Sequence, residues 1–369
     1  MDFGQINPIL LAASLMVAST PILLAALGEM VVKKAGALNL GVEGMMITGA
    51  VVGFAVGVNT QSPAAGFLAA GLAGAGLSLL FGLITQFLKS NQVATGLALT
   101  LFGLGLSSLI GKPYEGMKAT TLGKMHLPVL SDIPVLGPIL FRHDPMVYLS
   151  ILAVVAVWAV LTYSRAGLIL RAVGENHEAA HALGYKVVRV RLAAILFGGA
   201  MAGLGGAYVS LVRVPQWTEG MTSGAGWIAL AIVVFASWRP VRVLLGAYLF
   251  GGLTVLQLNL QAAGIPLLVA LPWLLAVLAP VSLVVSLAAQ AVRGGGFSTR
   301  ATLTWPAIFL AAALVVWLIG LATGFASGSD TLLLSSSPYL VTILVLVIIS
   351  LRGNHGAPGS LGRVFHASS

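Results

Sequence analysis

Residues 64–87, AAGFLAAGLAGAGLSLLFGLITQF, form an uninterrupted run of apolar and small residues without a single charge. As an α-helix, a run of this length crosses the hydrocarbon core of a bilayer, which is about 30 Å thick. Similar runs recur along the 369 residues, of which 58% are hydrophobic and only 8% charged. A soluble domain needs a charged surface. The pattern predicts an all-α, polytopic membrane protein and excludes a soluble domain of useful size.

About eleven spans are predicted from these runs. They are expected at residues 8–28, 43–58, 64–87, 92–111, 146–162, 192–212, 225–238, 243–262, 267–290, 304–323 and 337–351. Basic residues collect in the cytoplasmic loops of membrane proteins. With the N-terminus outside, the outer loops hold few of the 19 basic residues, namely Lys112, Lys118, Lys124, Arg142 and Arg213. The charges predict an outer N-terminus and an inner C-terminus, and they explain the net charge of +9 without a nucleic-acid partner.

Two of the predicted spans carry small residues at intervals of four. Gly199 and Gly203 have this spacing, and Gly66, Ala70 and Gly74 repeat it. In lipid, apolar surface alone gives helices no reason to associate, and small residues allow the backbones to approach closely. We expect these faces to pack within the chain.

The longest inner loop, residues 162–191, reads TYSRAGLILRAVGENHEAAHALGYKVVRVR. At its centre, Gly174-Glu175-Asn176 offers a helix cap, and the good helix formers EAAHAL follow. Basic residues flank this short predicted helix on both sides. A helix held beneath the membrane in this way can dock onto a soluble partner.

The loop resembles the permease family of importers for branched-chain amino acids, simple sugars and nucleosides. The stretches that carry the resemblance are Arg171–Asn176 (RAVGEN), Ala179-Ala180, Leu183-Gly184-Tyr185, 130–141 (LSDIPVLGPILF), 217–222 (WTEGMT) and 226–231 (GWIALA). A further stretch, 28–46 (GEMVVKKAGALNLGVEGMM), looks like the early signature of the nucleoside-type branch. Together they follow the expected order over roughly residues 15–265.

The resemblance implies a heteromeric importer in a bacterial-type cytoplasmic (inner) membrane. Its partners would be an ATP-binding cassette ATPase, a second permease subunit, an extracytoplasmic substrate-binding lipoprotein, membrane lipid and a small-molecule substrate. Nucleosides are the implied substrate class, with simple sugars or branched-chain amino acids as alternatives. ATP and Mg would be bound by the ATPase, with no cofactor in this chain. The residues implied to couple to the ATPase are Arg171, Gly174, Glu175, Asn176, Ala179, Ala180 and Gly184.

The resemblance to this family also predicts the domain organisation. Residues 1–265 are expected to form a family-like permease core with the coupling loop 162–191. Residues 266–335 have no counterpart in the family pattern and predict an extra transmembrane hairpin. Residues 336–352 form the last span, and 353–369 a flexible cytoplasmic tail. Two residues depart from the family pattern: His177 replaces a usual proline, and Ala225 an expected basic residue.

Two enzyme motifs bear on whether the chain has a catalytic activity of its own. No G-x-x-x-x-G-K-[ST] phosphate loop occurs in the sequence, so the chain is not expected to hydrolyse ATP itself. Residues 177–181 (HEAAH) match the H-E-x-x-H zinc peptidase pattern, which also needs a third protein ligand. The only carboxylates after His181 are Glu219 and Asp330, both predicted on the opposite side of the membrane. A coupling helix explains the same residues with fewer assumptions, so no metal site is expected, and the peptidase stays an alternative.

A secondary transporter driven by an ion gradient is the other alternative. Such a protein needs ionisable groups near the middle of its spans, and almost none are predicted here.

Seven polar or aromatic residues at or within the predicted spans are candidates for the substrate path: Glu29, Asn39, Glu43, Trp217, Thr218, Gln257 and Gln261. Each has a structural alternative. The two glutamates flank Lys33 and Lys34 and suit a structural pair at the membrane interface. Asn39 could cap the next helix, and Trp217 could be an interfacial anchor. Gln257 and Gln261 align on one helical face, where they could instead join neighbouring helices.

Overall fold

The computed structural model describes residues 8–262 apart from 127, 129 and 135, together with 272, 299–322, 339 and 356–365. All regular secondary structure in this part of the chain is helical. Two isolated bridges, Glu115 with Trp217 and Lys118 with Gln216, are the only β-type pairings among these residues. The all-α prediction is confirmed for the part of the chain that the structure describes.

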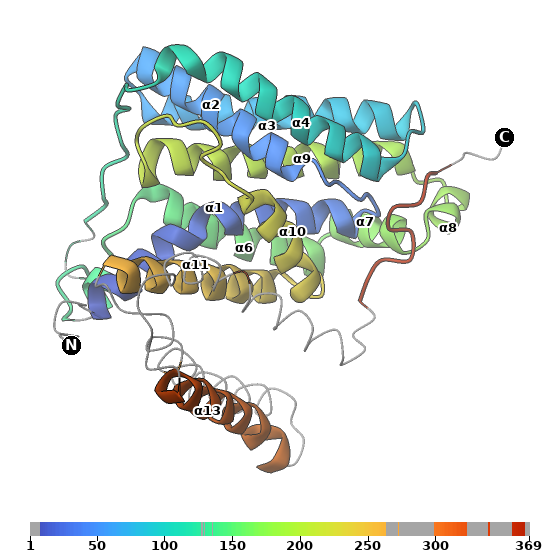
Figure 1. Cartoon of the computed structure of the whole chain (residues 1–369). Coiled ribbons are helices and arrows are strands. Elements are labelled where there is room, and N and C mark those ends of the chain that lie inside the picture. Colours follow the sequence, from blue (N-terminus) through green and yellow to red (C-terminus); the bar gives the residue numbers. More distant parts are fainter. Residues whose placement is uncertain are drawn as a thin grey trace. The chain divides into compact units, whose positions relative to one another are not determined.

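Figure 1 shows the helices in chain order. Their bounds are α1 Pro8–Lys34, α2 Val42–Thr60, α3 Pro63–Gln86, α4 Gln92–Gly111, η2 Lys112–Tyr114, α5 Leu136–Leu140, α6 Pro145–Tyr163, α7 Arg165–Glu175, α8 His177–Ala182, α9 Val187–Tyr208, η3 Val209–Arg213, α10 Ala225–Phe235, α11 Pro240–Ala262 and α13 Thr299–Ala322.

Seven helices in the described residues are long and apolar enough to cross a membrane: Ile9–Lys34, Val42–Thr60, Pro63–Gln86, Gln92–Tyr114, Pro145–Tyr163, Val187–Arg213 and Pro240–Asn259. They correspond to the first six predicted spans and to the span predicted at 243–262. The spans predicted at 225–238 and 304–323 contain the shorter apolar helices Ala225–Val234 and Phe309–Leu318. The spans predicted at 267–290 and 337–351 lie outside the described residues. The total of eleven spans and the orientation of the termini therefore stay predictions.

The chain divides into two compact units. The larger unit is described at 8–252 and 356–365 and contains α1 to α10 with most of α11. The smaller unit is described at 253–262, 272, 299–322 and 339 and contains the end of α11 and α13.

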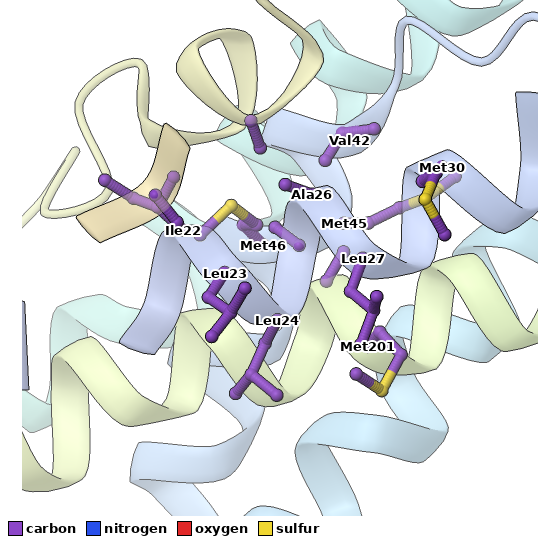
Figure 2. Close-up of a cluster of buried hydrophobic side chains, with 14 of the residues drawn as sticks. Ile22, Leu23, Leu24, Ala26, Leu27, Met30, Val42, Met45, Met46 and Met201 are labelled. Carbon is purple, nitrogen blue, oxygen red and sulfur yellow. The ribbon is translucent and has the colours of Figure 1, made fainter. Parts of the chain in front are cut away.

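The core of the larger unit lies where α1, α2 and α9 meet. Figure 2 shows Leu23, Leu24 and Leu27 of α1 in one cluster with Met46 of α2 and Met201 of α9. The three leucines are completely or almost completely buried. Unbranched methionine side chains fill irregular gaps between helices. Helix α1 is thereby enclosed by side chains along much of its length.

Helix α9 approaches its neighbours through glycine. A methyl group added at Gly74 of α3 would collide with the carbonyl of Gly199, and one at Gly203 with the carbonyl of Ala70. A methyl group at Gly206 would likewise collide with the carbonyl of Met46 in α2. The prediction that the small-residue faces pack within the chain is confirmed.

We predict that Gly206→Ala lowers the thermal melting temperature of the purified chain in detergent. The added methyl must push α2 and α9 apart, and overpacking of this kind costs about 1–3 kcal/mol. Gly76→Ala is the matched control, because nothing lies within 4 Å of a methyl group placed there. Equal melting temperatures for the two variants would contradict the α2–α9 contact.

Candidate functional site

Two short helices outside the candidate spans form the first part of the site. Ser164 caps α7, because its hydroxyl accepts a hydrogen bond of 3.0 Å from the backbone N–H of Gly167. Asn176 ends α7 and caps α8, since its Oδ1 atom accepts from the backbone N–H of Ala179 at 2.9 Å. The cap and the following short helix that the sequence predicts are confirmed.

Helix α8 ends at Ala182, and Gly184, two residues further on, adopts φ +87°. Two backbone bonds close this end: Tyr185 N–H donates to Ala180 at 3.1 Å, and Gly184 N–H donates to His181 at 2.8 Å. This pair of bonds is a Schellman motif, and glycine is favoured at its left-handed position. Leu183 is left 78% exposed directly after α8.

The predicted coupling residues fall into two groups. Gly174 and Ala180 are buried and face the rest of the chain. A methyl group at Gly174 would collide with the carbonyl of Lys34 at the end of α1, so glycine is required there. The other predicted coupling residues are exposed, namely Arg171, Glu175, Asn176, Ala179 and Gly184.

A cavity of about 300 Å³ lies beside α7, between this helix and the end of α1. Its lining includes Lys34, Arg171 and Glu175. A second cavity, of about 200 Å³, includes Glu178 and Arg363 in its lining. The structure thus brings two of the predicted coupling residues, Arg171 and Glu175, to one cavity.

Residues 356–365, which we name the C-terminal strap, lie against α7 and α8 (Figure 1). Ser360 N–H donates to the carbonyl of Gly174 at 2.9 Å. The Ser360 hydroxyl accepts from His177 N–H at 3.0 Å and donates to the carbonyl of Glu175 at 3.3 Å. These bonds hold the strap to the α7–α8 junction, whereas the sequence predicts a flexible tail over 353–369. Such partners lie far apart in sequence and leave no local signal.

Arg191 of α9 lies at the centre of this arrangement and is completely buried. Its guanidinium donates to the carbonyls of Ala35 at 3.2 Å, Arg363 at 2.9 Å and Ser360 at 3.4 Å. It also donates to Nδ1 of His177 at 3.2 Å. The sequence alone did not predict this role, because Arg191 stands out there only as the last residue of the inner loop 162–191. The planar fork of arginine suits several acceptors at once.

The two histidines of the HEAAH stretch contact side chains of α9 and the strap. Nδ1 of His177 accepts from Arg191, which places the ring proton on Nε2. The rings of His177 and His181 both pack edge-on against Phe365, with centroids 5.4 and 5.1 Å away. Burial lowers the pKa of the His177 imidazole from its ordinary 6.5, and the charge of Arg191 acts in the same direction. His177 is therefore neutral at pH 7 and able to accept from Arg191.

The second part of the site is the loop that leads into α10. Glu43 of α2 is buried, and its carboxylate accepts from the Thr222 hydroxyl at 2.5 Å and from the N–H groups of Gly224 and Gly226 at 3.1 and 2.7 Å. A carboxylate is favourable at this position because the N-terminus of a helix carries partial positive charge. Glu43 thus fixes the C-terminal end of the loop, next to α10.

Trp217 fixes the N-terminal end of the same loop. Its side chain is only 1% exposed, and its indole ring occupies the space beside Gly111 at the end of α4. Between these two anchors, Thr218 and Glu219 are exposed. The Ser108 hydroxyl of α4 donates to Glu219 at 2.5 Å. The sequence reading did not include Glu219 in the substrate path, although it directly follows Trp217 and Thr218.

Two further candidates for the substrate path are Glu29, in α1, and Asn39, between α1 and α2. Glu29 and Lys33 are buried in α1, where Lys33 donates to the carbonyl of Leu230 at 3.5 Å. The Oε1 atom of Glu29 is buried without a hydrogen-bond partner among the described residues. The side-chain oxygen of Asn39 accepts a hydrogen bond of 2.8 Å from the N–H of Gly41, which directly precedes α2. Asn39 thus forms a turn before that helix.

In the smaller unit, the side chains of Gln257 and Gln261 bond to each other at 2.9 Å. Their predicted alignment on one helical face is confirmed. Whether they contact substrate stays a prediction.

We predict that acid loosens the strap through His177. Because its pKa is lowered in the folded chain, the unfolded chain binds a proton more readily as pH falls below 6.5, and the stability that the neutral ring contributes is lost. The protonated ring would also face Arg191, with Arg363 nearby and only Glu178 opposing them. The melting temperature in detergent should fall between pH 7.5 and 5.5, and His177→Gln should reduce that fall. His181→Gln is the control; equal pH dependence in both variants would contradict this account.

The chain matches the family model described as "Branched-chain amino acid transport system / permease component" over residues 11–278. It is 44% identical over 254 residues to a putative glucose ABC transporter permease protein of Haloferax volcanii, covering 68% of this chain and 77% of the relative. A guanosine ABC transporter permease protein of Bacillus subtilis is 34% identical over 294 residues, covering 76% of this chain and 91% of the relative.

A nucleoside ABC transporter permease protein of Lactococcus lactis is 30% identical over 258 residues, covering 67% of this chain and 81% of the relative. No solved structure matches the chain. The apolar helices and the extent of the family match agree on a multi-pass membrane protein that serves transport. The chain therefore belongs to the family of branched-chain amino acid transport system permease components, and it is a permease subunit of an ABC transporter.

Proposed function

We propose that the chain is the permease subunit of an ATP-driven importer for nucleosides, and that a separate ATPase docks on α8. The observation that carries the docking site is the arrangement of α7, α8 and the strap. Here a short helix outside the candidate spans is fixed to α1 and α9 on one side, while Leu183 and Glu178 are exposed on the other. ATP and Mg are bound by the ATPase, and its movements reach the spans through α8.

The proposed assembly contains a second permease subunit and an extracytoplasmic binding lipoprotein. It lies in the inner membrane, with the strap and α8 on the cytoplasmic side and the loop 214–224 on the outer side. The distribution of basic residues supports this orientation, because Arg165, Arg171, Lys186, Arg189 and Arg363 all lie on or beside α7, α8 and the strap.

Two relatives support nucleosides as substrate, since they carry the names guanosine and nucleoside permease. The Haloferax relative favours glucose as the second candidate, because its identity to this chain is higher. A nucleoside and a hexose both present ring hydroxyls, so both classes need polar acceptors along the path.

Glu219 and Thr218 are the residues that we propose to meet the substrate first. A carboxylate is costly in lipid, so the region where Ser108 of α4 meets Glu219 of the loop is expected to line a hydrated path. Glu43 and Trp217 act on the path by fixing the loop at its two ends. Glu29, Asn39, Gln257 and Gln261 remain proposed members of the path.

We predict that the complex, purified from native membranes and reconstituted in proteoliposomes, takes up radiolabelled guanosine only with ATP. Excess unlabelled adenosine should lower this uptake at least about tenfold, and excess glucose should not. Glu219→Gln should raise the half-saturating guanosine concentration about tenfold, because a hydrogen bond to a charged group contributes about 1.5–3 kcal/mol.

Glu115→Gln is the matched control, since Glu115 is another exposed carboxylate in the same outer region. Competition by glucose but not by adenosine would replace nucleosides with sugars as the substrate class. An unchanged half-saturating concentration in Glu219→Gln would remove Glu219 from the path.

A further inference from the structure

The C-terminal strap joins segments that are distant in the sequence. Ser360 binds the backbone of Gly174, Glu175 and His177, which lie at the junction of α7 and α8. Two residues later, Gly362 N–H donates to the carbonyl of Gly36, just beyond α1, at 3.1 Å. The strap thus connects the coupling segment to the end of the first span.

Arg191 adds α9 to this connection. Its four hydrogen bonds reach the end of α1, the strap and α8. Burying a charge is favourable only when hydrogen bonds replace its hydration, and here three backbone carbonyls and one imidazole do so. Removal of any one of these segments would leave a buried donor unpaired.

The strap region is tightly packed at two of its glycine contacts. A methyl group at Gly36 would lie 2.9 Å from Nη2 of Arg191, and one at Gly359 would lie 2.7 Å from the carbonyl of Glu175. Atoms this close require a neighbour to shift. Close-packed contacts of this kind transmit displacement.

Helix α8 depends on the strap for its own small core. Val173, Ala180, Val187 and Phe365 form a buried cluster separate from the main core of the larger unit. The first three come from α7, α8 and α9, and Phe365 comes from the strap. Helix α8 has only six residues, and so short a helix is unstable without tertiary contacts.

We propose that the strap and Arg191 are positioning elements of coupling, which fix α8 to the ends of α1 and α9. A force that an ATPase applies to α8 then moves the spans, whereas without the strap α8 would pivot about Asn176 and Gly184. This inference rests on the proposed docking of an ATPase at α8. The strap leaves Leu183 and Glu178 exposed, so it positions α8 without covering the surface that a partner needs.

The position of the strap is tested by a disulfide. The chain contains no cysteine, so an introduced pair reports without background. A Cβ atom at Gly356 would lie 3.7 Å from the Cβ atom of Ser237, close to the mean distance in disulfides. In the complex in native membranes, mild oxidation of Ser237→Cys/Gly356→Cys should link the two residues, as read by mass spectrometry of the digested chain. Failure to form the link would overturn the proposal.

The coupling role is tested with Ser360→Ala, which removes only the hydroxyl at the α7–α8 junction. We expect the number of ATP molecules hydrolysed per substrate molecule transported to rise about fivefold, with the amount of co-purified ATPase unchanged. Ser360→Thr keeps a hydroxyl and should restore the ratio. Ser14→Ala is the matched control, because the Ser14 hydroxyl is exposed and bonds only within α1.

An unchanged ratio in Ser360→Ala, loss of the ATPase from that complex, or failure of Ser360→Thr to restore the ratio would each overturn the positioning role. The ratio is measured with guanosine, or with glucose if the unmodified complex transports glucose instead. A wrong substrate assignment is therefore detected in the unmodified complex, separately from the effect of Ser360→Ala.

Discussion

The close approach of α9 to α1, α2 and α3 is the constraint on which the larger unit depends. In lipid, helices associate through packing contacts rather than through exclusion of water, and packing is tightest where no side chain separates the backbones. Gly198 and Gly205 provide this approach to α1, and Gly199, Gly203 and Gly206 provide it to α2 and α3. At its two ends, α9 carries Arg191 in the strap network and Tyr208, whose hydroxyl donates to Asp144 at 2.7 Å. A displacement of α9 therefore affects both ends of the bundle.

Two buried charges in this unit, Arg191 and Glu43, contact helix ends. Arg191 binds the carbonyl of Ala35, directly after the C-terminal end of α1, where the helix dipole is negative. Glu43 binds N–H groups at the start of α10, where the dipole is positive. These two contacts place one charge beside the coupling segment and the other beside the loop proposed to meet substrate. The same electrostatic rule thus applies in both parts of the candidate site.

Features with local causes could be predicted from the sequence. The cap at Asn176, the spacing of Gln257 with Gln261, and seven of the spans depend on neighbouring residues or on continuous apolar runs. The partners of Glu43 and Ser360 could not be predicted, because Thr222 and His177 lie 179 and 183 residues away in the sequence. Trp217 illustrates the same limit: its aromatic ring suggested stacking on substrate, whereas the structure buries it beside Gly111.

The central claim is that α8, held by the strap, is the surface through which an ATPase moves this permease. A structure of the complete complex by electron cryo-microscopy tests this claim most directly. The account predicts that Leu183 lies buried in a groove of the ATPase, with residues 356–365 still bound to the α7–α8 junction. An ATPase bound elsewhere on the chain, with α8 exposed to solvent, would contradict it.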